Sequence, residues 1–152
     1  MSNVLNKTIL SDGTQKAVMH FYLESDGVGG EFNNEVLIDP YVDFSVLPTE
    51  QRDPDYDGPG LVGHVEIFNL TILQVWSATA WFDFKLSWDA SPPVPFFVWA
   101  RDSEFKIDMR HFSGMQPAKF DLNEPTGKIL ITTSNFAPLG SAGMIIIEFR
   151  KN

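Results

Sequence analysis

The sequence predicts an all-β protein, an antiparallel β-sandwich with long loops and little or no helix. Residues 79–89 alternate strictly, which gives a strand one buried and one mostly polar face. The first face holds Ala80, Phe82, Phe84, Leu86 and Trp88, and the second Trp81, Asp83, Lys85, Ser87 and Asp89. No window of a dozen residues carries a helical apolar period. About nine or ten short segments separated by turn residues are typical of a sandwich, of which the jelly roll is one form.

Length and composition predict one globular domain over residues 1–152. Hydrophobic residues make up 43% of the chain, and the 13 Phe and 4 Trp indicate a core of few, bulky side chains.

The charge balance excludes several partners. A net charge of −9 disfavours nucleic acid and anionic membrane surfaces, both of which require clustered Lys and Arg. The chain has no cysteine, so disulfides and thiolate metal sites are absent. Residues 1–7 lack the apolar segment of a signal peptide, and we expect synthesis in the cytoplasm without one.

The first half of the chain contains three predicted strands before the alternating segment. Residues 4–10 form a short strand, and residues 1–10 are a candidate N-terminal arm. Residues 15–24 alternate with Ala17, Met19, Phe21 and Leu23 on one side. Residues 35–39 are a brief strand closed by Pro40.

The middle of the chain is less regular. Residues 41–60 hold three prolines and five acidic residues, and are predicted to be a long acidic loop, of a length that is usually functional or contacts a partner. Residues 61–76 are strand-like, with Gly63 and Asn69 as turn or bulge positions.

The second half predicts four further strands. The prolines of residues 91–95 exclude an inner strand there. Strands are expected at residues 96–100, 104–112, 128–133 and 142–150. The apolar run Met144–Ile147 predicts that the last strand is central and covered on both faces.

Asp53, Asp55 and Asp57, followed by Gly58, match the start of a calcium-binding loop. The match fails at its twelfth position, where His64 replaces the bidentate Glu. A solvated acidic loop is therefore the simpler interpretation, and we expect no cofactor.

The three histidines, His20, His64 and His111, are too far apart in sequence for a ligand-like spacing. A carboxylate pair for glycoside hydrolysis is defined by distance in space, so the sequence leaves it open. No nucleophile elbow, phosphate loop or dinucleotide fingerprint is present, and we expect a protein without catalytic activity.

Exposed tryptophans stack on sugars or anchor protein interfaces. Trp88 lies on the apolar face and is expected in the core. Trp81 lies on the polar face beside Asp83 and is the best candidate for contact with a partner, although a partly covered role in cross-strand packing is the simpler interpretation.

The chain resembles small structural proteins of tailed bacteriophages. Three groups of segments carry the likeness: residues 1–14 with 17–27; residues 36–40 with 73–77 and 80–83; and residues 135–140 with 145–148. They are strand-and-turn patterns that extend over nearly the whole chain and contain no chemical signature.

The resemblance implies a capsid decoration or cement protein on the outer surface of the virion. Its partners would be the major capsid protein and further copies of itself in a homotrimer at local three-fold positions. Tyr41 and Tyr56 in the acidic loop, Leu5 in the arm, and Trp81 with Asp83 are the candidate contact residues.

Two other functions remain open. The first is a tail, fibre or carbohydrate-binding module that recognises the host surface through a groove lined by Trp81 and Asp83. The second is a small enzyme that acts on glycosides.

Overall fold

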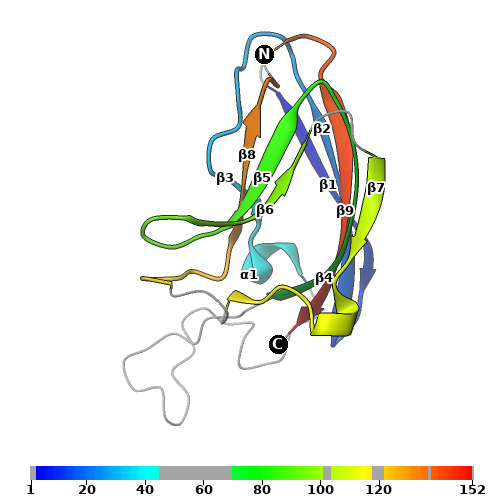
Figure 1. Cartoon of the computed structure of the whole chain (residues 1–152), viewed down its shortest axis with the longest axis vertical. Coiled ribbons are helices and arrows are strands. Elements are labelled where there is room, and N and C mark those ends of the chain that lie inside the picture. Colours follow the sequence, from blue (N-terminus) through cyan, green and yellow to red (C-terminus); the bar gives the residue numbers. More distant parts are fainter. Residues whose placement is uncertain (1–2, 45–69, 101–103, 118–121, 137, 152) are drawn as a thin grey trace.

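The chain folds into two antiparallel sheets that face each other, as a computed structural model shows (Figure 1). The structure describes residues 3–44, 70–100, 104–117, 122–136 and 138–151. One sheet has the order β1-β2-β9-β4-β7 and the other the order β3-β8-β5-β6. The strands are β1 (Val4–Asp12), β2 (Lys16–Glu24), β3 (Glu35–Ile38), β4 (Leu70–Ala80), β5 (Asp83–Trp88), β6 (Val94–Trp99), β7 (Glu104–Asp108), β8 (Ile129–Ser134) and β9 (Ala142–Lys151). The predicted antiparallel β-sandwich is confirmed.

Two single helical turns lie wholly within the described ranges. The first is α1 (Pro40–Asp43), which begins at the proline predicted to close β3, and the second is the 3-10 turn η1 (Arg110–Phe112). η1 interrupts the strand predicted over residues 104–112, because β7 ends at Asp108. Among the described residues, no helix has the length and apolar character needed to span a membrane.

The strands pair as a nested set. β2 pairs with β9, β3 with β8, β4 with β7 and β5 with β6, so the chain from β2 to β9 follows the course of one long hairpin that is folded over. Pairing of β4 with β9 and of β5 with β8 then closes each sheet. β9 is consequently the central strand of the five-stranded sheet, as its apolar run predicts.

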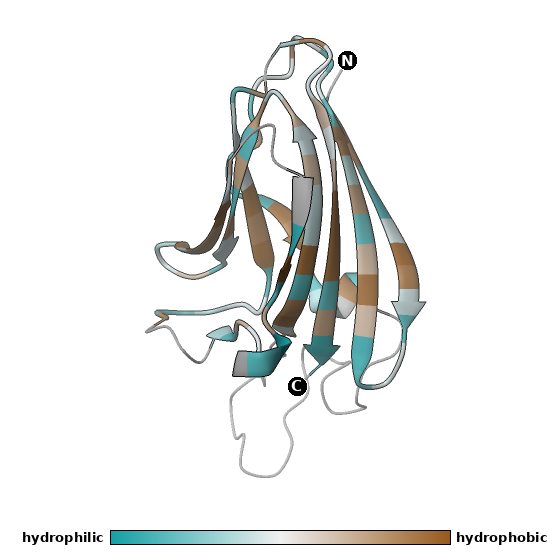
Figure 2. Cartoon of the chain, turned by 45° about the vertical axis from the view of Figure 1, so that its right-hand side comes forward, coloured by the Kyte–Doolittle hydropathy of each residue, from teal (hydrophilic) through white to brown (hydrophobic). Residues whose placement is uncertain are grey.

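The core lies between the sheets and is formed by the inward positions of the alternating strands. Figure 2 shows hydrophobic and hydrophilic bands that follow each other along these strands. The inward face of β2 is buried as predicted. Four large apolar residues of the alternating segment 79–89 are buried as well. These four are Phe82, Phe84, Leu86 and Trp88.

The prediction of one continuous strand over residues 80–89 is wrong. β4 ends at Ala80, β5 begins at Asp83, and the chain passes from one sheet to the other between them. Ala80 is exposed rather than inward-facing. Alternation does not reveal such a crossing, because an inward residue of one sheet and an inward residue of the facing sheet enter the same core.

Two further predictions need correction. Residues 4–12 pair with β2 from Val4 opposite Glu24 to Asp12 opposite Ala17, so this segment is an edge strand of the sheet instead of an extended arm. The central strand β9 is covered on one face only: Ile145 and Ile147 are buried, whereas Met144 is 41% exposed on the outer face. β6 begins at Val94, within the proline-rich segment predicted not to be an inner strand, and it is an edge strand of its sheet.

A buried ion pair closes the end of the sandwich where the chain terminates. The Lys151 side chain has no exposed surface, and its Nζ pairs with the Asp12 carboxylate. It also donates to the Gly13 carbonyl at 2.6 Å and lies 4.8 Å from the centre of the Phe44 ring. The turn between β1 and β2 is thereby fixed to the last residue of β9.

We predict that Asp12→Asn lowers the free energy of unfolding by about 3–5 kcal/mol, because it removes the charge of one partner from a buried ion pair. Urea denaturation at neutral pH measures this loss. The matched control is Asp39→Asn, whose partner Lys128 is 3.9 Å away and substantially exposed. This control is expected to cost about 1 kcal/mol or less. Equal losses in the two variants would contradict the assignment.

Candidate functional site: an apolar tip of three loops

Three loops meet at the end of the sandwich near the N-terminus (Figure 1). They are residues 25–34 between β2 and β3, residues 81–82 between β4 and β5, and residues 135–141 between β8 and β9. Each carries one strongly exposed apolar side chain: Val28 at 85%, Trp81 at 60% and Leu139 at 73%. We call these three residues the loop tip.

The three loops are in contact. A Cβ atom added to Gly27, next to Val28, would lie 3.0 Å from Cβ of Leu139. One added to Gly140 would lie 3.8 Å from the ring of Trp81. The three loops therefore lie side by side and gather the three exposed apolar side chains at one end of the sandwich. Patches of this kind on a protein surface mark interaction sites.

Short hydrogen bonds fix the loop that carries Val28. The Asp26 carboxylate accepts from the backbone N–H groups of Val28 at 2.8 Å and Gly29 at 2.5 Å, and these donors lower the pKa of Asp26. Asn3 holds the loop from outside: its Oδ1 accepts from the Asp26 N–H at 3.1 Å, and its Nδ2 donates to the Gly30 carbonyl at 2.7 Å. Gly27 and Gly30 have positive φ angles, which suit the turns that they form.

The carboxylate of Glu31 fixes the loop that carries Leu139. One oxygen accepts from the Phe136 N–H and the other from the Thr133 hydroxyl, both at 2.7 Å. The Ser25 N–H donates to the Ser141 carbonyl at 2.8 Å and joins the two loops at their bases. Both loops are thus held before any partner binds.

Trp81 is presented by the crossing between the sheets. Its backbone φ is 71°, a value that is unfavourable for a bulky residue. The next residue, Phe82, is buried and packs edge-on against Phe136 with ring centroids 4.9 Å apart. At Gly143 a Cβ atom would lie 2.9 Å from the Phe82 ring, so this glycine makes room for it. Burial of Phe82 therefore turns Trp81 outward.

Acidic residues occur within or next to the three loops in the sequence. Glu24 and Glu31 are exposed, and Asp26 and Asp83 lie close to the same loops in sequence. The described residues of the three loops include no Lys and no Arg. The tip thus offers apolar contact within a negative environment, a combination that favours a partner with basic groups around an apolar surface.

The structure separates the predicted contact residues. Trp81 belongs to the loop tip, whereas Tyr41 lies in α1, away from the tip (Figure 1). Leu5 lies on β1 and lines a groove of about 580 Å³ between β1 and β3, together with Phe32 and Val36. Tyr56 and the calcium candidates Asp53, Asp55 and Asp57 fall outside the described residues, as does His64.

Asp83 does not share a groove with Trp81. It lines a shallow hollow of about 180 Å³ on the outer face of the four-stranded sheet with Lys85, Val98 and Thr132, and Trp81 is not among its described lining residues. Asn135 donates to Asp83 at 3.5 Å. The sugar-binding groove predicted from these two residues is not formed in the described part of the chain.

Val28 and Leu139 are the site residues that the sequence interpretation missed. Each stands in a loop beside glycine or proline, with no strand pattern around it. A large apolar residue within a polar turn is the feature of the sequence that could have indicated each of them. This feature is weak, because single exposed apolar residues are common on protein surfaces. Only their meeting in space makes them a site.

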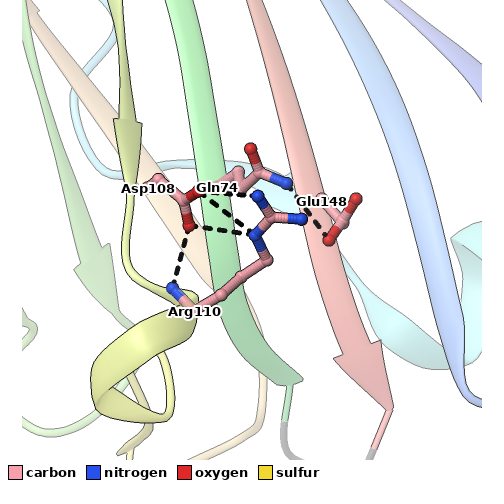
Figure 3. Close-up of polar contacts among 4 residues, drawn as sticks. All are labelled: Gln74, Asp108, Arg110 and Glu148. Atoms are coloured by element: carbon pink, nitrogen blue, oxygen red, sulfur yellow. Dashed lines mark hydrogen bonds and ion pairs between the residues drawn. The ribbon is translucent and has the colours of Figure 1, made fainter.

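A polar cluster lies on the outer face of the five-stranded sheet (Figure 3). The Arg110 guanidinium donates to both oxygens of Asp108, at 2.7 Å from Nη2 and 3.0 Å from Nε. These bonds hold the pKa of Asp108 well below its usual range and raise that of Arg110. The nearby Gln74 carboxamide, which is buried, donates to Glu148 at 3.5 Å. A carboxyl with a lowered pKa stays ionised, so the pair is suited to fixing η1 on the sheet rather than to proton transfer.

The described residues contain no group of three or more His, Asp or Glu side chains arranged to hold a metal ion. His20 lies on β2 and His111 in η1, so these two come from different elements.

Comparison with protein-family models, with curated proteins and with solved structures finds no match to this chain. The site therefore has to be interpreted from its own geometry.

We predict that Asp108→Asn lowers stability at neutral pH, and that this loss disappears in acid. Because the pKa of Asp108 is lower in the folded than in the unfolded chain, its contribution is present above about pH 4 and is lost as the pH falls further. Urea denaturation of both proteins from pH 7 to pH 2.5 tests this. Arg110→Gln should give the same profile, and a difference that is independent of pH would refute the assignment.

We also predict that Trp81→Gly is more stable than Trp81→Ala by about 1 kcal/mol. Both variants remove the same indole, but glycine adopts a positive φ without strain. Thermal unfolding of the two variants measures the difference. A more stable alanine variant would show that the crossing is not strained at this position.

Proposed function

We propose that this protein is a non-catalytic β-sandwich binding protein that attaches to another protein through its loop tip. The observation that carries this proposal is the set of exposed apolar side chains Val28, Trp81 and Leu139 on three adjacent loops, two of which are fixed by hydrogen bonds. The partner that we propose is the major capsid protein of a tailed bacteriophage. The protein would then act as a decoration or cement protein on the outer surface of the shell.

Fixed loops lower the free-energy cost of binding a partner. Association loses affinity when loops have to be ordered, and a fixed loop tip avoids most of that loss. Large apolar side chains at the centre of an interface, above all tryptophan, contribute most of the binding free energy. Trp81 held outward by a strained backbone fits this role, because such strain is typical of functional positions.

The nested strand pairing supports the same class of protein. We interpret the pairs β2–β9, β3–β8, β4–β7 and β5–β6 as a jelly roll preceded by the edge strand β1. Jelly rolls occur in viral capsid proteins and in lectins. The fold is thus compatible with a virion component, and the resemblance of the sequence to phage structural proteins favours that choice.

The lectin alternative rests on the exposed indole of Trp81. An indole stacks on a sugar ring while amides and carboxylates bind its hydroxyl groups. Under this alternative the protein recognises the host surface from a tail or fibre.

The experiment that tests the proposal measures binding of the purified protein to phage heads that lack it. We expect Trp81→Ala or Val28→Asp to weaken binding by about thirtyfold or more, because each removes an anchor of at least about 2 kcal/mol. The matched control is Val98→Asp, which alters a side chain of similar exposure, 72%, on the edge strand β6. Quantitative mass spectrometry of purified particles gives the copy number.

The outcomes separate the alternatives. The capsid proposal is supported if each particle carries hundreds of copies, if the loop-tip variants no longer bind, and if Val98→Asp still binds. A few copies per particle, together with glycan binding that is lost in Trp81→Ala, favour host recognition. Absence from particles, or equal binding by all variants, would overturn the proposal.

A further inference from the structure

The outer face of the five-stranded sheet has an apolar centre. Strand register places His20, Ile146 and Trp76 in one row across β2, β9 and β4. The next row contains Tyr22, Met144 and Ala78. Met144 is 41% exposed, and the other residues of the two rows are partly exposed. No described element lies over this face (Figure 2).

Charges of opposite sign stand at the two ends of this face. Lys16 begins β2 and is paired with Arg150 of β9, which gives one end two positive charges. Glu24 ends β2 on the same face, and its carboxylate accepts from the Tyr22 hydroxyl at 3.1 Å. Lys16 and Glu24 are separated by eight residues of strand, or about 27 Å, so they do not pair within one chain.

We propose that this face binds the same face of a second copy of the chain. The two copies are related by a two-fold axis that lies between their five-stranded sheets and runs perpendicular to the strands. Such an axis reverses the strand direction of the second copy. Lys16 of one copy then faces Glu24 of the other, and the same contact occurs twice. The row of His20, Ile146 and Trp76 packs against its own counterpart at the centre.

The partner is a second copy because the face is complementary to itself. The row of His20, Ile146 and Trp76 lies on the axis, and Lys16 and Glu24 of β2 exchange under the rotation. Lys106 ends this row on β7, with its Nζ 5.5 Å from the centre of the Trp76 ring. The area is also adequate: five strands about 4.8 Å apart and about nine residues long form a face of roughly 600–700 Å². Stable interfaces bury about 800 Å² per partner, and weaker ones somewhat less.

The polar cluster lies between the central row and the Lys16 end of the proposed interface. Glu148 and Gln74 occupy the row between Ile146 and Arg150, and Arg110 and Asp108 form their ion pair beside them at β7. The Glu148 carboxylate accepts from Gln74, and Asp108 from Arg110, so both acidic groups have partners within the chain.

The contact gives a two-fold dimer, whereas the resemblance to phage structural proteins implied a homotrimer. It also leaves the loop tip uncovered at the end of the sandwich. The dimer is thus independent of the proposed attachment through Trp81.

The test uses charge reversal at the two ends of β2. Lys16→Glu and Glu24→Lys each place like charges opposite each other twice in a homodimer. We expect each to weaken dimerisation at low salt by about a hundredfold. An equimolar mixture of the two variants restores complementary contacts in both positions, so we expect a heterodimer with affinity close to that of the unchanged protein. Sedimentation velocity measures the masses and the dissociation constants.

Matched controls are Lys85→Glu on the other sheet and Glu35→Lys on β3, both of which should leave the dimer unchanged. Trp81→Ala should also dimerise normally. The proposal would be overturned if the unchanged protein is monomeric at high concentration or has the mass of a trimer. It would also be overturned if the single variants do not weaken the dimer and their mixture does not restore it.

Discussion

Burial of Phe82 at the crossing between the sheets is the constraint on which much of this structure depends. Its ring occupies the space that Gly143 leaves open and packs against Phe136, which belongs to the loop after β8. One aromatic side chain therefore positions the end of β4, the start of β5 and the loop between β8 and β9. The backbone reaches this arrangement only through the positive φ of Trp81, and the indole is directed outward as a result.

The loop tip follows from the same packing. Phe136 is fixed from one side by Phe82 and from the other by the Glu31 carboxylate, which accepts from its N–H. Glu31 in turn belongs to the loop that carries Val28, so the three exposed side chains are attached to one connected support. A site of this kind presents apolar surface without requiring the loops to reorganise, which is what an attachment protein needs.

The central position of β9 gives the molecule its second surface. Ile145 and Ile147 complete the core, while Met144 and Ile146 alternate with them and face outward among residues of β2 and β4. A run of apolar residues on a central strand commonly means cover on both faces. In this structure the four-stranded sheet covers the inner face of β9. The outer face of the five-stranded sheet is apolar at its centre and charged at its ends.

The sequence by itself determined the fold class and the inward residues of β2 and β5, because these depend on alternation, which is a local property. Tertiary structure decided where the chain changes sheets, since residues 80–89 keep their alternation through the crossing at Trp81 and Phe82. It also decided the composition of the site. Trp81 stands out in the sequence, but Val28 and Leu139 acquire meaning only because strand pairing brings loops more than a hundred residues apart into contact. Such proximity is set by the packing of the two sheets, which no local pattern records.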